Sequence, residues 1–464
     1  MTKIYSARWV LPIVSAPVGD GAVAVEGARV VGVGARAEVA ARFPEAELED
    51  FGEAAILPGF VNCHTHLELT AMRGFLEAEE GNFFAWLRKI TLARRERMTP
   101  DGLYASAAWG AVEAVRAGVT TVADASDAAA TTLKALGDVG LRAVVYQEVF
   151  GADEREARQQ FEKAREKIER LRGGETALVT LGLSPHSPYT VSPPLLRMLA
   201  RFARDERLPL MMHAAESEAE QLLMTEGRGP FAEGFASRGF KFRSPGTSTV
   251  RHLEATGVLD ARPLLAHCVR VDEADIRLIK ERGASVAHCP KSNAKLGHGR
   301  APLAALLGAG ATVGLGSDSV ASNNTCDLLE EARFAALASR AAGERVEGGR
   351  MISPDDALRL MTTGGARALR LEGATGALAE GLGADLAVVR LDAAHQTPAY
   401  DPAAALVFAS TGRDVLLTVV AGREIFRDGR VTTVDEDELR ARVRDAARRL
   451  AAAGETETRN SGAD

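Results

Sequence analysis

Between residues 55 and 372 the sequence repeats one unit, a short apolar run that ends at a polar residue and is followed by a stretch with helical spacing. Such alternation indicates βα units, in which successive strands lie parallel. The eight runs are AILPGFV, VTTVA, RAVVYQ, LVTLGLSP, LPLMM, PLLA, ASVA and TVGLGS. Eight units favour an α/β fold with a closed (β/α)8 TIM barrel, in which the active site follows the C-terminal ends of the strands.

The two ends of the chain have a different pattern. Residues 1–54 and 373–434 contain glycine-bounded β-like runs, such as AVAVEGARVVGVG and VLLTVVAGREIFRDGRV. We expect both segments to form one small accessory β-sandwich domain beside a barrel that spans residues 55–372. Residues 435–464 are predicted to form an amphipathic helix, DEDELRARVRDAARRLAAAG, and a tail.

Charge and composition narrow the classes of partner. The 464 residues carry a net charge of −7 without a sustained basic stretch, which argues against nucleic acid or an anionic membrane as partner. No apolar run is long enough for a membrane span, and no signal-peptide pattern is recognised. The four cysteines lack CxxC spacing and do not resemble a disulfide framework. We expect a cytoplasmic protein with a small-molecule substrate, and leave a homodimer open.

The segment LPGFVNCHTHLELT places two histidines one residue apart behind an apolar run. If residues 55–62 form a strand, alternation sends His64 and His66 to the same side and Cys63 to the opposite face. Two converging imidazoles suit a divalent metal at about 2.0–2.1 Å. One such pair is weak evidence by itself, because isolated histidines at strand ends are common.

Two further strand ends supply residues that could complete a metal site. His213 follows LPLMM and Asp318 follows TVGLGS. Together with His64 and His66 they offer three neutral imidazoles and one carboxylate, a set that suits zinc or iron(II) and leaves a position for water.

Other polar residues have candidate roles beside this set. Glu216, three residues after His213, could carry a proton between water and substrate, and the alternative is that it caps the next helix. His267 could orient the attack, or could be an ordinary histidine of a polar rim. His252, His298 and His395 have no recognisable partners and are predicted to be solvated.

The ordered set HTH, SPH, MHAAE, AHC, HCPKSN and GSDS resembles the amidohydrolase superfamily, in its branch of adenosine-type nucleoside deaminases. The resemblance implies a hydrolytic aminohydrolase with one divalent metal, expected to be Zn²⁺, with Fe²⁺ or Mn²⁺ left open. It implies that the ligands are His64, His66, His213 and Asp318, that Glu216 shuttles protons, that His267 assists, and that Asp318 accepts a proton from the attacking water. Many members carry a metal-bridging lysine after the fourth strand. His186 occupies that position here, so a single metal is expected.

A wider set of segments looks similar to aminodeoxyfutalosine deaminases, namely HTHLEL, QEVFG, SPHSPYTV, HCPKSN, LGHG and DSVASNN. This resemblance implies the conversion of aminodeoxyfutalosine to futalosine in menaquinone biosynthesis, with release of ammonia. His186 is expected to contact the nucleoside. Glu68 is a candidate for polar sugar atoms, and Arg73 and Arg95 are candidates for the substrate's benzoate-type carboxylate. Glu148 is a further candidate for contact with the substrate.

Three alternatives stay open from the sequence. S-adenosylhomocysteine/methylthioadenosine deaminases carry a ribose-binding glutamate where this chain has Arg95, and an arginine near the third strand where it has Glu148. An ionised Glu148 would repel the amino-acid carboxylate of that substrate. A chlorohydrolase acting on a related ring and a non-catalytic protein of the same fold are the other two.

Overall fold

The computed structural model describes residues 2–240 and 242–452. Its centre is a ring of parallel strands in two four-stranded sheets, ordered β6-β7-β8-β9 and β10-β11-β12-β13. The bounds of these strands are β6 Phe60–Thr65, β7 Val119–Ser126, β8 Arg142–Val149, β9 Val179–Pro185, β10 Met211–Ala214, β11 Leu264–His267, β12 Ser285–His288 and β13 Thr312–Leu315.

Backbone hydrogen bonds join the two sheets at both seams. The amide of Leu183 donates to the carbonyl of Pro209 at 2.8 Å, and the amide of Asp318 donates to the carbonyl of His64 at 2.8 Å. The ring is therefore closed, and the predicted TIM-barrel type of fold is confirmed. Each of the predicted apolar runs contributes to one of these strands.

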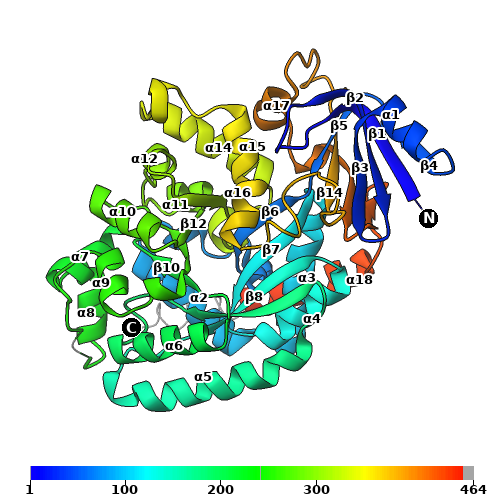
Figure 1. Ribbon diagram of the computed structural model, residues 1–464. Helices are drawn as coiled ribbons and strands as arrows, with labels where there is room; N and C mark the ends of the chain where they lie inside the picture. Colours follow the sequence, from blue (N-terminus) through cyan, green and yellow to red (C-terminus); the bar gives the residue numbers. More distant parts are fainter. Residues whose placement is uncertain (1, 241, 453–464) are drawn as a thin grey trace.

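Most of the helices and short turns surround the ring (Figure 1). The helices are α1 Arg36–Arg42, α2 Phe83–Arg97, α3 Pro100–Arg116, α4 Ala129–Val139, α5 Ala157–Leu171, α6 Pro193–Asp205, α7 Glu218–Glu226, α8 Pro230–Ala236, α9 Thr249–Ala255, α10 Glu273–Glu281, α11 Pro290–Lys295, α12 Leu303–Gly308, α13 Val320–Asn323, α14 Leu328–Ala341, α15 Pro354–Leu360, α16 Thr363–Ala368, α17 Pro402–Ala404 and α18 Glu436–Ala452. Short turns are η1 Leu67–Met72, η2 Glu77–Glu79, η3 Glu154–Glu156, η4 Arg172–Gly174, η5 Leu259–Ala261, η6 Glu347–Gly349, η7 Ala405–Ala409 and η8 Gly412–Asp414.

The prediction of a single strand over residues 55–62 is wrong. The chain forms β5 (Ala54–Pro58) and then β6, with a break at Gly59. A β-carbon at Gly59 would lie 2.0 Å from the Cγ2 atom of Thr120, so only glycine fits at this crossing. The apolar sequence runs on through the break, although β5 pairs with β1 and β14 outside the barrel.

Both ends of the chain contribute to one mixed nine-stranded sheet, ordered β17-β16-β15-β14-β5-β1-β2-β3, with β4 paired to β1. Its remaining strands are β1 Thr2–Val10, β2 Val18–Glu26, β3 Arg29–Ala35, β4 Glu47–Asp50, β14 Leu386–Arg390, β15 Val415–Val420, β16 Arg423–Arg427 and β17 Arg430–Val431. Figure 1 shows its N-terminal strands in blue beside its C-terminal strands in orange. The sandwich form expected for this domain is not confirmed, because the described strands are hydrogen-bonded in one sheet.

The predicted C-terminal helix is present as α18, which packs against α3 (Figure 1). Leu450 and Ala446 of this helix lie in an apolar cluster with Trp86 of α2. The helix thereby supports the segment that covers one side of the barrel mouth. The predicted tail, residues 454–464, lies outside the described residues. Among the residues that are described, every helix is too short or too polar to cross a bilayer.

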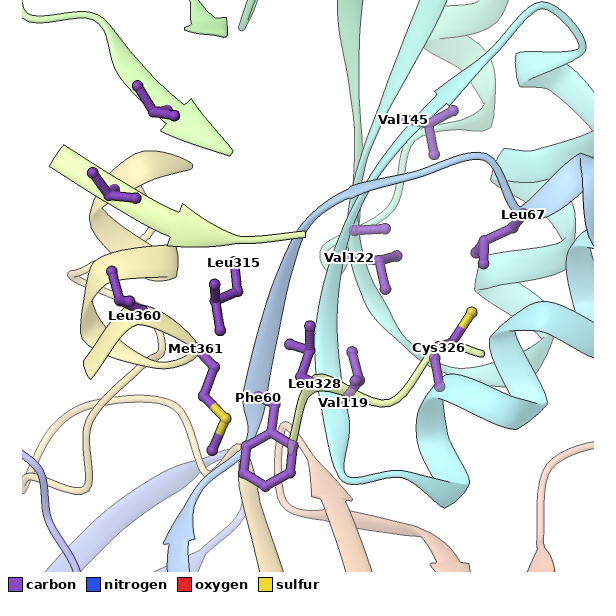
Figure 2. Packing of buried hydrophobic residues seen from close by; sticks show 14 of the residues in the cluster. Phe60, Leu67, Val119, Val122, Val145, Leu315, Cys326, Leu328, Leu360 and Met361 are labelled. Atoms are coloured by element: carbon purple, nitrogen blue, oxygen red, sulfur yellow. The ribbon is translucent and has the colours of Figure 1, made fainter. Parts of the chain in front are cut away.

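A large apolar core fills the layer between the strands and the helices. Figure 2 shows Phe60 close to Val119 and Met361 in this core. Phe60 is fully buried, and the amide of the next residue, Val61, donates to the carbonyl of Met361 at 2.8 Å. Each buried side chain of this size stabilises the fold by roughly 1.5–3 kcal/mol, which holds the strand ends above it in place.

Candidate active site

A cavity of about 870 Å³ opens where the barrel strands end. Most of the residues predicted for the site line it, namely His66, Glu68, Arg95, Glu148, His186, His213, Glu216, His267 and Asp318. His64 is fully buried at its base. Residues from separate strands therefore meet in one cavity, as the barrel topology requires.

The predicted metal ligands converge on one point. The nitrogen atoms offered by His64, His66 and His213 all lie within 4.8 Å of one another. His66 Nε2 and His213 Nε2 are 3.1 Å apart. Asp318 Oδ1 lies 3.4 Å from His64 Nε2 and 3.7 Å from His66 Nε2. Three imidazoles and one carboxylate thus face a common centre.

The remaining polar atoms of the cluster are held by the protein. Asp318 Oδ2 accepts hydrogen bonds from the hydroxyls of Ser292 at 2.5 Å and Ser322 at 2.8 Å, which leaves Oδ1 for the centre. His213 Nδ1 lies 2.8 Å from the carbonyl oxygen of His186 and donates to it, so His213 Nε2 carries a lone pair. His64 Nε2 is buried without a hydrogen-bond partner among the described residues. This donor set fits a divalent metal.

Burial sets the protonation of these imidazoles. It lowers the pKa of His64 to about 4, of His213 to about 4, and of His66 to about 3. All three rings are therefore neutral near pH 7, which is the form that binds a metal.

Two further groups have their ligand atoms within 4.8 Å of one another, one formed by His64, His267 and Asp318 and the other by Glu148, His186 and His213. His213 cannot serve both the first centre and the group with Glu148, because its Nδ1 is hydrogen-bonded to a carbonyl and its Nε2 faces the first centre. Two protein ligands would remain there for a second ion. Both further groups share residues with the first centre, and a single metal stays a prediction.

Glu216 lies at the edge of the cluster. Its Oε1 atom is 3.7 Å from His267 Nε2 and 3.5 Å from His298 Nε2. Burial alone raises the pKa of Glu216, but the two histidines outweigh burial and lower that pKa to about 2. His267 Nδ1 contacts Asn293 Oδ1 at 2.9 Å, which fixes the ring. This carboxylate is thus buried, ionised and close to the cluster without belonging to it.

The backbone is strained at several of these positions. Ala215, His267 and Asp318 have φ values of 53°, 75° and 58°, in the left-handed region that residues with a β-carbon rarely adopt. Such conformations cost about 1–3 kcal/mol each and persist where the surrounding structure enforces them. Their concentration around one cavity is typical of a functional site.

The substrate-binding candidates Glu148 and Glu68 occupy different environments. Glu148 Oε1 lies 4.0 Å from His186 Nε2 and is without a hydrogen-bond partner among the described residues. Burial and the nearby Glu68 carboxylate raise the pKa of Glu148 well above 4.5. A neutral Glu148 would repel a substrate carboxylate less than an ionised Glu148 would.

Glu68 is already engaged by the protein. Its Oε1 accepts a hydrogen bond from Arg94 Nε at 2.5 Å, and its Oε2 accepts from the Ala128 amide at 3.0 Å and from the Ser126 hydroxyl. A direct role with sugar atoms stays a prediction, since both oxygens have protein partners. Arg94 also donates to Asp127 at 2.9 Å and lines the cavity, although the sequence argument did not select it.

Of the two arginines predicted to bind the substrate carboxylate, one lines the cavity and the other does not. Arg95 lines the cavity and donates to Glu96 at 2.8 Å. Arg73 pairs with Glu113 of α3 and does not line the cavity, because the turn after η1 directs it toward that helix. Two arginines that the sequence argument missed, Arg88 and Arg238, do line it.

Of the three histidines predicted to be solvated, His252 and His298 are buried instead, whereas His395 is exposed as predicted. His252 lies buried in α9, where burial lowers its pKa to about 4. His298 is buried beside Glu216. His395 is half exposed but lies 3.3 Å from Asp414. Their partners are remote in the sequence, so local patterns did not reveal them, although the glycines on both sides of His298 were a usable signal.

Comparison with known proteins agrees with this geometry. The model of the Amidohydrolase family matches residues 55–425. The 5-methylthioadenosine/S-adenosylhomocysteine deaminase of Pelotomaculum thermopropionicum is 34% identical over 93% of this chain and 94% of its own length. The protein of the same name from Syntrophobacter fumaroxidans is 35% identical over 93% of each chain.

Two solved structures share the fold over nearly the whole chain. An adenosine deaminase from Xanthomonas campestris with bound zinc superposes with a TM-score of 0.85 at 28% identity, covering 97% of this chain and 98% of the other. Atrazine chlorohydrolase from Arthrobacter aurescens, complexed with zinc, superposes with a TM-score of 0.82 at 25% identity, covering 96% and 99%. Together with the converging histidines and aspartate, these matches show that the chain belongs to the amidohydrolase family and is a hydrolytic aminohydrolase.

Proposed function

We propose that this protein is a divalent-metal-dependent deaminase of an adenine-containing nucleoside. The observation that carries the proposal is the buried Glu216 carboxylate beside the cluster of three histidines and one aspartate. Replacement of an amino group by oxygen needs a group that moves protons at the reacting ring. The curated relatives named as nucleoside deaminases support the same reaction class.

We assign the metal to His64, His66, His213 and Asp318 and expect it to be zinc. The donor set and the zinc in two neighbouring structures support this assignment. A divalent ion at this position supplies activated water at neutral pH.

The chain's own residues would then move the protons. The oxygen of water bonds to C6 of the adenine ring, and Glu216 delivers one proton of that water to the adjacent ring nitrogen N1. The second water proton passes by way of Asp318 to the amino group, which leaves as ammonia while C6 keeps the oxygen. His267, fixed by Asn293, orients the attack.

For the physiological substrate we propose aminodeoxyfutalosine, which carries a carboxyphenyl ketone. Support comes from the outer part of the cavity, where Phe84, Phe231 and Phe235 provide apolar surface. Arg88 and Arg238 lie exposed at the same rim and make no ion pair within the described part of the chain. Aromatic surface with unpaired arginines suits an aryl carboxylate.

S-adenosylhomocysteine or methylthioadenosine is the second candidate substrate. The names of the curated relatives favour it, and the raised pKa of Glu148 weakens the argument from charge repulsion. Methylthioadenosine has no anionic group, so the rim arginines would have no role with it. The two candidates therefore predict different substrate preferences.

The test is release of ammonia by zinc-loaded protein from aminodeoxyfutalosine, methylthioadenosine, S-adenosylhomocysteine and adenosine, with chloride release from atrazine measured in parallel. We expect kcat/KM to be highest for aminodeoxyfutalosine. A higher value for methylthioadenosine or S-adenosylhomocysteine would overturn the substrate assignment but leave the deaminase intact. Chloride release without ammonia from any nucleoside would overturn the deaminase itself.

A further inference from the structure

His298 is a buried histidine that has no role in the proposed reaction steps. It follows α11 in the sequence LGHG, and its side chain is 5% exposed. Its neighbours Gly297 and Gly299 have φ values of 70° and 100°, which residues with a β-carbon rarely adopt. A β-carbon on Gly297 would meet nothing within 4 Å, so backbone conformation rather than space calls for glycine there. The backbone conformation of these two glycines directs the imidazole of His298 inward.

Two contacts define the orientation of the imidazole. Its ring packs edge-on against Phe83 of α2, with centroids 4.4 Å apart and planes at 77°. Its Nε2 lies 3.5 Å from Glu216 Oε1 and has no closer hydrogen-bond partner among the described residues. The distance is long for a hydrogen bond but lies within the limit of about 4 Å for a contact between charged groups. His298 does not line the cavity, so it acts behind Glu216 rather than on the substrate.

The backbone of Glu216 is fixed independently. The Glu220 carboxylate accepts hydrogen bonds from the amides of Ala215 at 2.8 Å and Glu216 at 2.9 Å. Rotation of the side chain is therefore the main freedom that Glu216 retains. A carboxylate that must accept and return a proton at one ring nitrogen gains from having that freedom removed.

We propose that His298 is a positioning residue. Together with His267 it holds Glu216 Oε1 in place, and the other carboxylate oxygen, Oε2, is thereby presented to the substrate ring. The inference rests on the proposed function, because it assumes that Glu216 carries the proton. It assigns His298 a role through Glu216 and not through the metal cluster.

The test compares His298→Leu, which removes the contact, with His298→Gln, whose amide nitrogen can reach the position of Nε2. The substrate is the nucleoside that the wild type deaminates best. We expect His298→Leu to lower kcat about tenfold or more, because Glu216 would lose its fixed orientation toward the substrate ring. KM should change less than twofold, zinc content should stay at the wild-type level, and His298→Gln should recover most of kcat.

His252→Leu is the matched control, because it makes the same exchange at a histidine that is buried in α9 away from the cavity. Its kcat should equal that of the wild type. If His298→Leu does not fold, His298→Asn replaces it, since its shorter amide does not reach Glu216 and the same loss of kcat is expected.

Unchanged kcat in the leucine variant, or a glutamine variant as slow as the leucine variant, would overturn the proposal. Loss of zinc in His298→Leu would also overturn it, because the residue would then support the metal cluster. Crystal structures of both variants give a readout separate from activity: the Glu216 carboxylate should rotate in the leucine variant and stay in place in the glutamine variant. If the wild type deaminates no nucleoside, the proposed function fails, while these structures still test the contact.

Discussion

At the scale of single residues, the site depends on how one short segment is folded. His213 lies one residue before the end of β10, Ala215 takes a left-handed conformation, and Glu216 is thereby turned toward His267 and His298. Glu220 anchors the turn by accepting both amides, and burial raises its own pKa to about 7. The segment HAAESEAE thus contains both the proposed proton carrier and the group that fixes its backbone.

The first prediction concerns Glu216→Gln. The amide keeps the size of the side chain but cannot transfer a proton, so kcat should fall by about 10²–10⁴-fold, the usual contribution of a general acid or base. Zinc content, measured by elemental analysis, should remain that of the wild type. Asp318→Ala is the matched comparison and should lose zinc as well as activity. Turnover at the wild-type rate in Glu216→Gln would show that the proton-carrier assignment is wrong.

At the scale of elements, the chemistry and the substrate contacts come from different parts of the fold. The strand ends supply the histidines and carboxylates, whereas α2 and α8 with the turn after it supply the outer wall of the cavity. Phe84 of α2 and Phe231 of α8 have ring centroids 6.1 Å apart, and Tyr189 stacks on Phe231 at 4.5 Å. Specificity can therefore change in these helices without disturbing the strand ends.

The second prediction tests this wall through Arg238→Ala. Removing one exposed cation from the carboxylate end should raise KM for aminodeoxyfutalosine about tenfold, the scale of a hydrogen bond to a charged group. KM for adenosine, which has no carboxylate, should be unchanged. Arg158→Ala on α5 is the control, because Arg158 is exposed and paired with Glu162 outside the cavity. Equal effects on both nucleosides would rule out selective recognition of the carboxylate by Arg238.

At the scale of the whole molecule, the two ends of the chain are joined by a charged cluster on the nine-stranded sheet. Glu424 of β16 accepts hydrogen bonds from Lys3 at 2.7 Å and Tyr5 at 2.8 Å, both on β1, and from Arg427 at 2.7 Å. Burial raises the pKa of Glu424, but the hydrogen bonds outweigh burial and lower that pKa to about 2. The ionised carboxylate therefore stabilises the folded state.

The third prediction follows from the sign of that shift. A carboxylate whose folded pKa lies below its ordinary value of 4.5 contributes full stability above about pH 4.5 and loses it as the pH falls toward 2. Glu424→Gln should lower Tm by about 2–4 °C at pH 7, and the difference from wild type should shrink below pH 4.5. Thermal unfolding at pH 3 and pH 7 measures the difference in Tm between the variant and the wild type. Glu38→Gln is the control, because Glu38 of α1 is exposed. A Tm difference that is the same at pH 3 and pH 7 would contradict the role of ionised Glu424.

Local patterns were sufficient for the barrel and for much of the site. An apolar run that ends at His213 or Asp318 carries its own information, because strand propensity and the residue at the strand end are both local properties. Once the strands are parallel and closed, topology alone brings those ends together. The roles assigned to these side chains remain predictions, although the structure places them in one cluster.

Contacts between distant segments were beyond local reasoning. Residues 55–62 read as one strand, yet the chain breaks at Gly59 and its halves join different sheets. The break requires glycine because Thr120 leaves no room for a β-carbon there. Arg73 and Arg238 are both basic residues in loops, and only packing against α3 or beside α8 decides which reaches the cavity.

The amino-acid sequence by itself determined the eight βα units, the ordered polar residues at their ends and the family resemblance. Only the tertiary structure decided that both chain ends form one sheet, that Glu68 is engaged by Arg94, and that His298 faces Glu216. The physical reason is that periodicity and propensity act over a few neighbouring residues. The partner of a buried polar group, by contrast, is chosen by the packing of segments that are far apart along the chain.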